Sequence, residues 1–214
     1  MKTTVLVVGI GRFGEAAARE LMALGHEVLA VDLDEAIVNE IAPDVTHAVQ
    51  LDAADEDALR SIGVGDFDVA IVAISSATDA SIFATMALKN LGVSQVVAKA
   101  ATKLHGAILE RIGADRVIYA EAEMGHRVAH SLSINGALEY LDLAPDFGVV
   151  KLRPPASWVG QSLAALDLGR LEIAAVALRR GNAVTVNPPR DAVLAADDEV
   201  TLLGRDEQLQ RIGR

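Results

Sequence analysis

The chain contains no cysteine, few aromatic residues and no long uninterrupted apolar run. The absence of cysteine excludes disulfides, iron–sulfur clusters and thiolate catalysis. No apolar run approaches the length of about 20 residues that a membrane-spanning helix needs. Only Lys2 precedes the first apolar segment, so we expect no signal peptide. These absences predict a cytoplasmic protein that does not insert directly into the membrane.

Positive charge is also scarce. The chain has 30 acidic and 19 basic residues and a net charge of −11. Residues 151–214 hold 9 basic and 8 acidic side chains, which leaves 10 basic and 22 acidic ones for residues 1–150. A nucleic-acid-binding surface needs a basic stripe, and this distribution predicts no nucleic-acid partner. Any phosphate bound by the acidic part must be held by backbone amides and a few cations.

The most informative segment lies near the start of the chain. An apolar run at 5–8 meets glycines at positions 9, 11 and 14, and a helical pattern follows. This order is typical of a nucleotide-binding turn: Gly9 permits the tight turn, Gly11 admits a phosphate, and Gly14 lets the helix pack closely on the sheet. The helix N-terminus supplies unpaired N–H groups to the anion. Arg12, inside the turn, is the first candidate cation.

Strand and helix patterns alternate up to about residue 119. We predict strands at 4–8, 28–32, 46–51, 69–74, 95–99 and 116–119, helix N-caps at Asp34 and Asp55, and helix ends at Gly25, Gly92 and Gly113. Short runs rich in Val and Ile are typical of a parallel sheet covered by helices on both faces. The sequence therefore predicts an α/β fold with a doubly wound, Rossmann-like sheet.

A different pattern follows. A long helix is predicted at 121–135, where Met124, Val128 and Leu132 repeat at helical spacing and Asn135-Gly136 ends it. Further strands are predicted at 137–143, 148–153, 173–178, 183–187 and 199–203, with a hairpin turn at Gly181-Asn182 and helices at 161–168 and 206–212. We therefore predict a nucleotide-binding domain at 1–135 and a small α+β domain at 136–214.

Two acidic positions and the histidines bear on the function class. Asp32 ends the second strand, where an acid normally binds ribose hydroxyls, and the acids after it disfavour NADP. Asp52 ends the third strand and reads equally as an adenine-side residue or a turn aspartate. An NAD-dependent oxidoreductase is the natural alternative, but the second domain contains no histidine to transfer a proton. His126 and His130 have the spacing of two zinc ligands, yet we interpret them as helix-face histidines.

Several motifs together carry a family resemblance. They are Gly-Ile-Gly-Arg-Phe-Gly at 9–14, Val-Asp-Leu-Asp at 31–34, Leu-Asp-Ala-Ala-Asp-Glu-Asp at 51–57, Val-Ala-Lys-Ala at 97–100, and Ile-Gly-Ala-Asp-Arg-Val-Ile-Tyr-Ala-Glu at 112–121. In this order they resemble the regulatory subunits of Trk/Ktr-type potassium uptake systems, which are RCK (regulator of K+ conductance) proteins. The tail resembles the small C-terminal domain of that family, with Asn-Pro-Pro at 187–189 and Asp-Glu-Val-Thr-Leu-Leu-Gly at 198–204.

The resemblance assigns roles to individual residues. Arg12 matches an arginine that reaches the terminal phosphate of ATP, Asp32 the ribose acid, and Asp52-Ala53 the adenine side. Lys99 matches a lysine near the site, and Glu121 a glutamate at the nucleotide or cation site between subunits. The complete predicted site is Gly9, Ile10, Gly11, Arg12, Phe13, Gly14, Asp32, Leu33, Asp52, Ala53, Ile74, Lys99 and Glu121, with Glu121 also the candidate metal ligand.

The family also implies ligands and partners. ATP or ADP is the expected ligand, NAD or NADH an alternative, and a divalent cation a companion. Cyclic di-AMP in the C-terminal domain is suggested only by Arg170 and the 187–189 segment. The resemblance implies a non-catalytic sensor, a homodimer assembled into an octameric ring, and a Trk/Ktr-type membrane channel subunit whose cytosolic face it binds. The helix at 124–134 would cross between protomers.

Overall fold

The structure, a computed structural model, describes residues 2–74 and 77–212. Contacts divide the chain into two compact units, Met1–Glu121 and Ala122–Arg214. The long helix therefore belongs to the second unit by its contacts, whereas the sequence analysis placed it in the first domain. In the described part of the chain, no helix is both long enough and apolar enough to cross a lipid bilayer.

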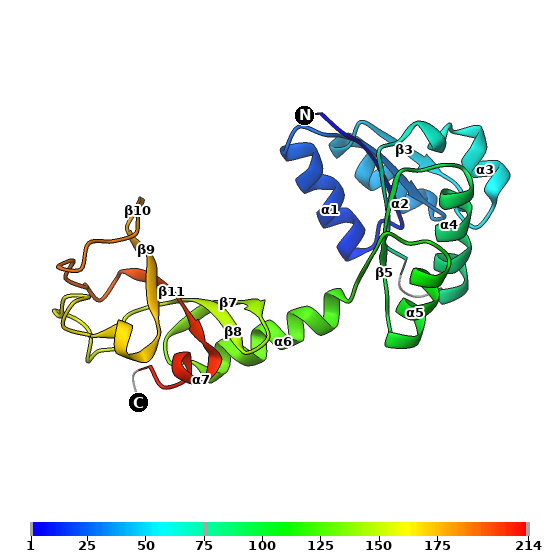
Figure 1. The fold of residues 1–214 in the computed structure, drawn as a ribbon. Coiled ribbons are helices and arrows are strands. Elements are labelled where there is room, and N and C mark those ends of the chain that lie inside the picture. Colours follow the sequence, from blue (N-terminus) through cyan, green and yellow to red (C-terminus); the bar gives the residue numbers. More distant parts are fainter. Residues whose placement is uncertain (1, 75–76, 213–214) are drawn as a thin grey trace. The chain divides into compact units, whose positions relative to one another are not determined.

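The first unit contains a six-stranded parallel sheet (Figure 1). Its strands are β1 (Thr4–Val8), β2 (Glu27–Asp32), β3 (His47–Gln50), β4 (Val69–Val72), β5 (Gln95–Lys99) and β6 (Arg116–Ile118). Their order in the sheet, β3-β2-β1-β4-β5-β6, is that of a doubly wound dinucleotide-binding fold. The predicted Rossmann-like sheet is confirmed. The order reverses between β1 and β4, and ligands bind this fold outside the carboxyl ends of the strands at such a point.

Helices cover both faces of this sheet. They are α1 (Arg12–Ala23), α2 (Glu35–Ile41), α3 (Glu56–Ser61), α4 (Thr78–Asn90) and α5 (Lys103–Arg111), with short 3-10 turns η1 (Ala42–Asp44) and η2 (Val64–Asp66). Val5 and Val7 of β1 pack with buried residues of α1 and α2. Leu6 and Val8 pack with those of α3, α4 and α5. Alternate residues of one strand thus face opposite cores, which explains the continuous apolar run in the sequence.

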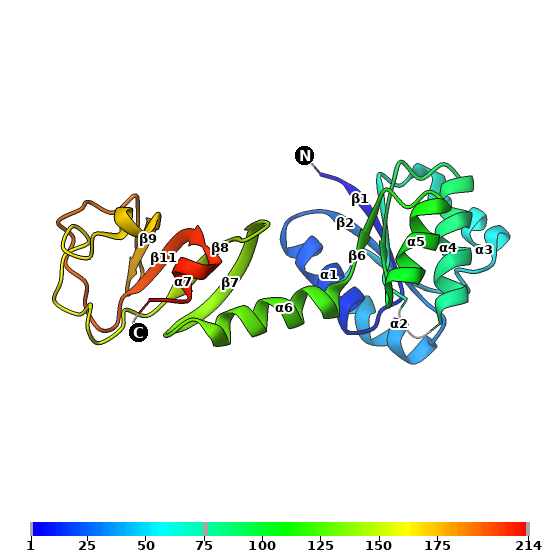
Figure 2. The ribbon, with the colours of Figure 1, turned by 60° about the horizontal axis from the view of Figure 1, so that its bottom comes forward.

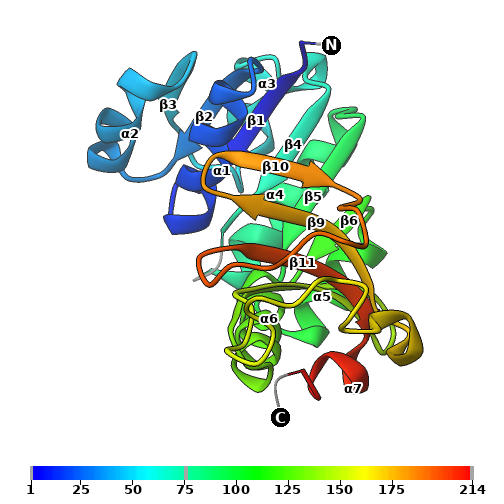
Figure 3. The same ribbon diagram turned by 90° about the vertical axis from the view of Figure 1, so that its left-hand side faces the viewer.

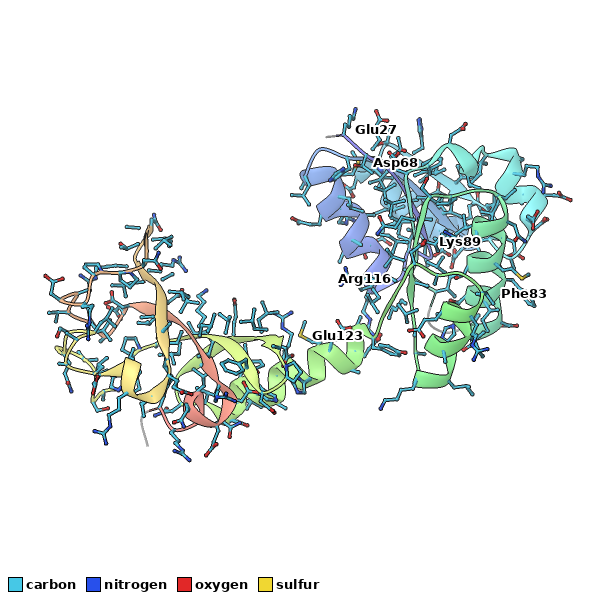
Figure 4. All side chains as sticks on the ribbon, in the orientation of Figure 1. Glu27, Asp68, Phe83, Lys89, Arg116 and Glu123 are labelled. Atoms are coloured by element: carbon cyan, nitrogen blue, oxygen red, sulfur yellow. The ribbon has the colours of Figure 1, made fainter. Side chains whose placement is uncertain are left out.

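Polar side chains secure the ends of these elements. As predicted, Asp34 and Asp55 are N-caps: Asp34 accepts a hydrogen bond from the Ala36 N–H, and Asp55 from two N–H groups of α3. Asp115, just before β6, accepts from the Val96 N–H at 2.7 Å and from Lys89 Nζ of α4 at 2.9 Å; Lys89 is labelled in Figure 4. These bonds, the backbone one first, lower the pKa of Asp115 below its ordinary value.

The second unit is built on a five-stranded antiparallel sheet, in which β10, β9 and β11 lie side by side in Figure 3. Its strands are β7 (Ala137–Ala144), β8 (Phe147–Leu152), β9 (Ala174–Arg180), β10 (Ala183–Val186) and β11 (Glu199–Arg205), in the order β10-β9-β11-β8-β7. The predicted hairpin at Gly181 is confirmed by the pairing of Ala183 with Arg180. One face buries residues such as Val150, Leu152 and Leu202. The small α+β domain is confirmed.

Three helical elements complete the second unit: the long helix α6 (Ala120–Ser133), η3 (Leu168–Leu171) and α7 (Asp206–Leu209). The predicted helix at 161–168 is wrong. That segment pairs with a distant one instead: Leu163 N–H donates to the Ala192 carbonyl at 3.0 Å, and Ser162 forms a β-bridge with Val193. The predicted helix at 206–212 is shorter than expected and ends at Leu209.

Candidate functional site

In the glycine turn after β1, each of the three glycines is placed differently. Gly9 has φ +87°, and a Cβ there would meet the Ile74 backbone nitrogen at 3.0 Å, so only glycine fits without strain. A Cβ on Gly14 would collide with the Gly9 carbonyl oxygen. The first helical turn can therefore lie directly against the loop because position 14 has no side chain.

Gly11 differs from the other two glycines. Its φ of −75° and ψ of −176° are accessible to any residue, and no atom lies within 4 Å of a Cβ built there. Gly11 is the N-cap of the 12-residue helix α1, with no side-chain cap on the first-turn N–H groups. These amides and the positive end of the helix dipole point into the open space, which suits a phosphate.

Asp32, at the carboxyl end of β2, holds this turn in place. Its Oδ2 accepts a hydrogen bond from the Ile10 N–H at 2.6 Å, and its Oδ1 accepts from the Asp34 N–H at 3.0 Å. The carboxylate is thus fixed beside the loop with remaining acceptor capacity on both oxygens. Vicinal ribose hydroxyls are donors that such a carboxylate can bind.

A cavity of about 450 Å³ opens where β1, β2, β3 and β4 end. Eight of the predicted site residues line it: Gly9, Gly11, Arg12, Asp32, Leu33, Asp52, Ala53 and Ile74. Asp52 also accepts a hydrogen bond from the Ala54 N–H at 2.9 Å, so it is both a turn aspartate and a lining residue. The cavity lies at the crevice expected from the strand order.

Sequence reasoning missed part of the cavity wall. The missed lining residues are Val8, Val31, Ile37, Leu51, Ala73, Ala77 and Ala80. Ile37 carried a usable signal, because α2, in which it lies, begins shortly after Asp32. No sequence pattern marks Ala77 and Ala80 at the start of α4 as lining residues, because they approach the glycine turn only when β4 pairs with β1.

The other five predicted residues lie outside that lining, and three of them form a cluster of their own. Lys99, only 5% exposed, extends its Nζ over the Phe13 ring at 5.6 Å from the centroid. The same Nζ donates to Glu121 Oε1 at 2.5 Å. This hydrogen bond, with the nearby charges of Lys99 and Arg12, lowers the pKa of the Glu121 carboxyl. Ile10 is buried, and Gly14 packs on the turn.

The metal prediction concerns Glu121 alone. Among residues 2–74 and 77–212, no group of three or more His, Cys, Asp or Glu side chains is placed to hold a metal ion. Glu121 has one carboxylate oxygen on Lys99 and a largely exposed side chain. A cation at this position would need further ligands from another molecule.

Comparisons with known proteins identify two domains in this chain. Residues 5–120 match the TrkA-N domain, and residues 149–214 match the TrkA-C domain. The chain is 37% identical to Ktr system potassium uptake protein C of Bacillus subtilis (strain 168), covering 99% of this chain and 96% of that protein. It is 34% identical to Ktr system potassium uptake protein A of the same organism, covering 96% and 93%.

Solved structures of the GsuK RCK domain and of the GsuK channel bound to NAD have the same fold. Each aligns with a TM-score of 0.68 at 16% identity over 98% of this chain. The chain spans 46% and 38% of those two longer chains. From its two matched domains and its Ktr relatives, the chain belongs to the TrkA-N/TrkA-C family of potassium uptake proteins.

Proposed function

We propose that this chain is a cytoplasmic regulatory subunit of a Ktr- or Trk-type potassium uptake system, and that it gates a membrane-embedded subunit by binding an adenine nucleotide. The observation that carries the proposal is the open space at Gly11, bounded by uncapped amides of α1 and by Asp32. The titratable residues lining the cavity are Arg12, Asp32 and Asp52. This set suits binding better than proton transfer, which favours a sensor over an oxidoreductase.

The polyphosphate end of the nucleotide would lie toward Arg12. This residue opens α1 and is exposed, so its guanidinium can reach a phosphate beyond those held by the backbone. Glu121, whose pKa Arg12 helps to lower, lies near the same region. If Arg12 contacts only the terminal phosphate, the site distinguishes ATP from ADP. Gating further requires that the bound nucleotide has different affinities for two shapes of the ring, and a contact that only ATP makes could supply that difference.

The helix α6 supports the proposed homodimer. It has no buried residue, and its apolar stripe Met124, Val128 and Leu132 is 54%, 48% and 82% exposed. The opposite side of the helix, with His126 and His130, contacts its own sheet. A helix that turns polar groups inward and an apolar stripe outward is typical of one that packs on a second copy. Dimers of this kind would then build the octameric ring.

Calorimetric titration with ATP, ADP and NADH, together with light scattering, tests the proposal. We expect binding of ATP and ADP with different affinities, and an octamer in solution. NADH binding alone is compatible with the proposal, since a GsuK channel of this fold binds NAD. A dimer that binds NADH tightly and turns over a substrate would refute it.

A variant of the stripe tests the dimer separately. Val128→Glu places a charge at its centre and should prevent dimerisation and with it ring assembly, measured by light scattering as loss of the octamer. Leu24→Glu, at another exposed apolar residue, is the matched control and should assemble normally. The homodimer proposal fails if Val128→Glu assembles as the wild type does. Co-expression with a Ktr-type membrane subunit in cells that lack potassium uptake then tests gating.

A further inference from the structure

One peptide group beside the nucleotide cavity is held by side chains at both of its ends. It is the peptide bond between Leu33 and Asp34, directly after β2. Its carbonyl oxygen, that of Leu33, accepts a hydrogen bond from Gln50 Nε2 at 3.0 Å. Its N–H, that of Asp34, donates to Asp32 Oδ1 at 3.0 Å. The orientation of the Asp32 carboxylate therefore depends on a peptide group whose other end is held by Gln50.

Gln50 reaches this peptide because of the strand pairing. It is the last residue of β3, the edge strand of the parallel sheet, and is the register partner of Asp32 in β2. The Leu51 N–H donates to the Asp32 carbonyl at 2.9 Å, which extends the pairing by one residue. β2 in turn lies beside β1, which leads into the glycine turn (Figure 2). A side chain of the edge strand thus supports a cavity residue that lies one strand further in.

The second oxygen of the Asp32 carboxylate has a different partner. Oδ2 accepts a hydrogen bond from the Ile10 N–H of the glycine turn at 2.6 Å. A carboxylate with one donor on each oxygen cannot rotate about its last torsion without losing a bond, so its remaining acceptor sites have fixed directions. Two adjacent ribose hydroxyls can bind both oxygens only while this orientation is kept.

Gln50 also strengthens the hydrogen bond that it supports. A carbonyl that accepts a hydrogen bond polarises its peptide group, which makes the N–H at the other end a better donor. Gln50 is exposed and is not among the described residues that line the cavity. It therefore acts on a ligand through the peptide and Asp32, not by contact.

We propose that Gln50 is a positioning residue that maintains the preference of the cavity for ligands with intact ribose hydroxyls. It keeps the Leu33–Asp34 peptide, and through it Asp32 Oδ1, in the orientation that two adjacent hydroxyls require. The inference rests on the proposed nucleotide function and on Asp32 as the ribose acid. It adds a residue outside the cavity on which the selection of a ribonucleotide depends.

The test compares ATP with 2′,3′-dideoxy-ATP, which lacks both hydroxyls and carries the same charge. Calorimetric titration of the full chain gives the ratio of the two affinities. We expect the wild type to bind ATP at least about tenfold more tightly, since the analogue makes no hydroxyl bond to the carboxylate. Gln50→Met keeps the length of the side chain without a donor, and should lower this ratio about threefold to tenfold.

Three further variants separate positioning from a merely structural role. Gln50→Arg carries its Nε–H the same number of bonds from the backbone as glutamine Nε2, so it should restore the ratio, and its charge acts equally on both ligands. His47→Met, on the same edge strand, is the matched control and should keep the wild-type ratio. Asp32→Asn should itself lower the ratio, and adding Gln50→Met should change it little further, because both act on one carboxylate.

The outcomes distinguish this inference from the proposed function. A wild type that binds neither ATP nor ADP overturns both. The inference alone is overturned if the wild type binds ATP no more tightly than the dideoxy analogue, or if Gln50→Met keeps the wild-type ratio, including by weakening both ligands equally. Gln50 is exposed, so Gln50→Met should melt close to the wild type. If it does not fold, Gln50→Glu, which also has no donor, takes its place in the same comparison.

Discussion

Replacing Gly11 by alanine separates ligand binding from folding at the glycine turn. The backbone angles of Gly11 suit alanine, and the new methyl group meets no protein atom within 4 Å. Alanine is a poorer N-cap than glycine by up to about 1 kcal/mol. Alanine also has less conformational freedom than glycine in the unfolded chain, and this stabilises the folded variant by about 0.4–1 kcal/mol. These effects nearly cancel, so the stability of Gly11→Ala should change by less than about 1 kcal/mol.

Binding should respond very differently. The methyl group occupies the space through which a phosphate reaches the α1 amides, and each lost charge-assisted hydrogen bond costs about 1.5–3 kcal/mol. Losing two such bonds weakens ATP and ADP more than about 100-fold. Thermal melting by circular dichroism and calorimetric titration measure the two effects.

Gly14→Ala is the opposite control. Its methyl group collides with the Gly9 carbonyl oxygen, so this variant should lose stability by about 1–3 kcal/mol or more. A Gly11→Ala protein that melts normally and binds ATP with unchanged affinity would refute the phosphate-cradle assignment.

Three further predictions concern single side chains. Arg12→Ala should weaken ATP about tenfold to a hundredfold and ADP much less, by calorimetry; equal losses would place Arg12 on the inner phosphates. Burial lowers the pKa of His105, so the first unit should lose stability as pH falls below about 6.5, where the unfolded chain takes up the proton. Hydrogen exchange of β1 measures this, and His105→Asn should flatten the slope. Asp198 is 1% exposed and accepts hydrogen bonds from Arg180 at 2.7 and 2.8 Å. Asp198→Asn should therefore lower the free energy of unfolding by about 1–3 kcal/mol, measured by Trp158 fluorescence during urea unfolding. An unchanged urea midpoint would contradict this.

The parts of the fold that follow local rules were predictable from the sequence. Apolar runs without alternation indicate strands buried on both faces, and Asp34 and Asp55 cap helices through bonds to N–H groups two or three residues on. The requirement for glycine at Gly14, which lies against the Gly9 carbonyl, is similarly local to one turn. In the caps and in this turn the partner lies a few residues away, so the sequence contains both halves of the interaction.

The errors arise where the partner is distant in sequence. Leucines at 163, 166 and 168 have a spacing close to that of a helix, but the backbone of this segment bonds to residues around 192 and 194. The cavity wall at Ala77 and Ala80 likewise depends on the pairing of β4 with β1. A sequence pattern predicts which face of an element is apolar but not which remote segment covers it.

The charge distribution explains the design of the proposed nucleotide site. The unit that carries it is strongly acidic, so long-range attraction cannot draw an anion to it. The positive groups are instead local: the amides of α1 and the guanidinium of Arg12. Local donors act within hydrogen-bond distance and are screened little by salt. Affinity for the proposed ligands should then follow the number of phosphates that reach these donors rather than the total charge of the ligand.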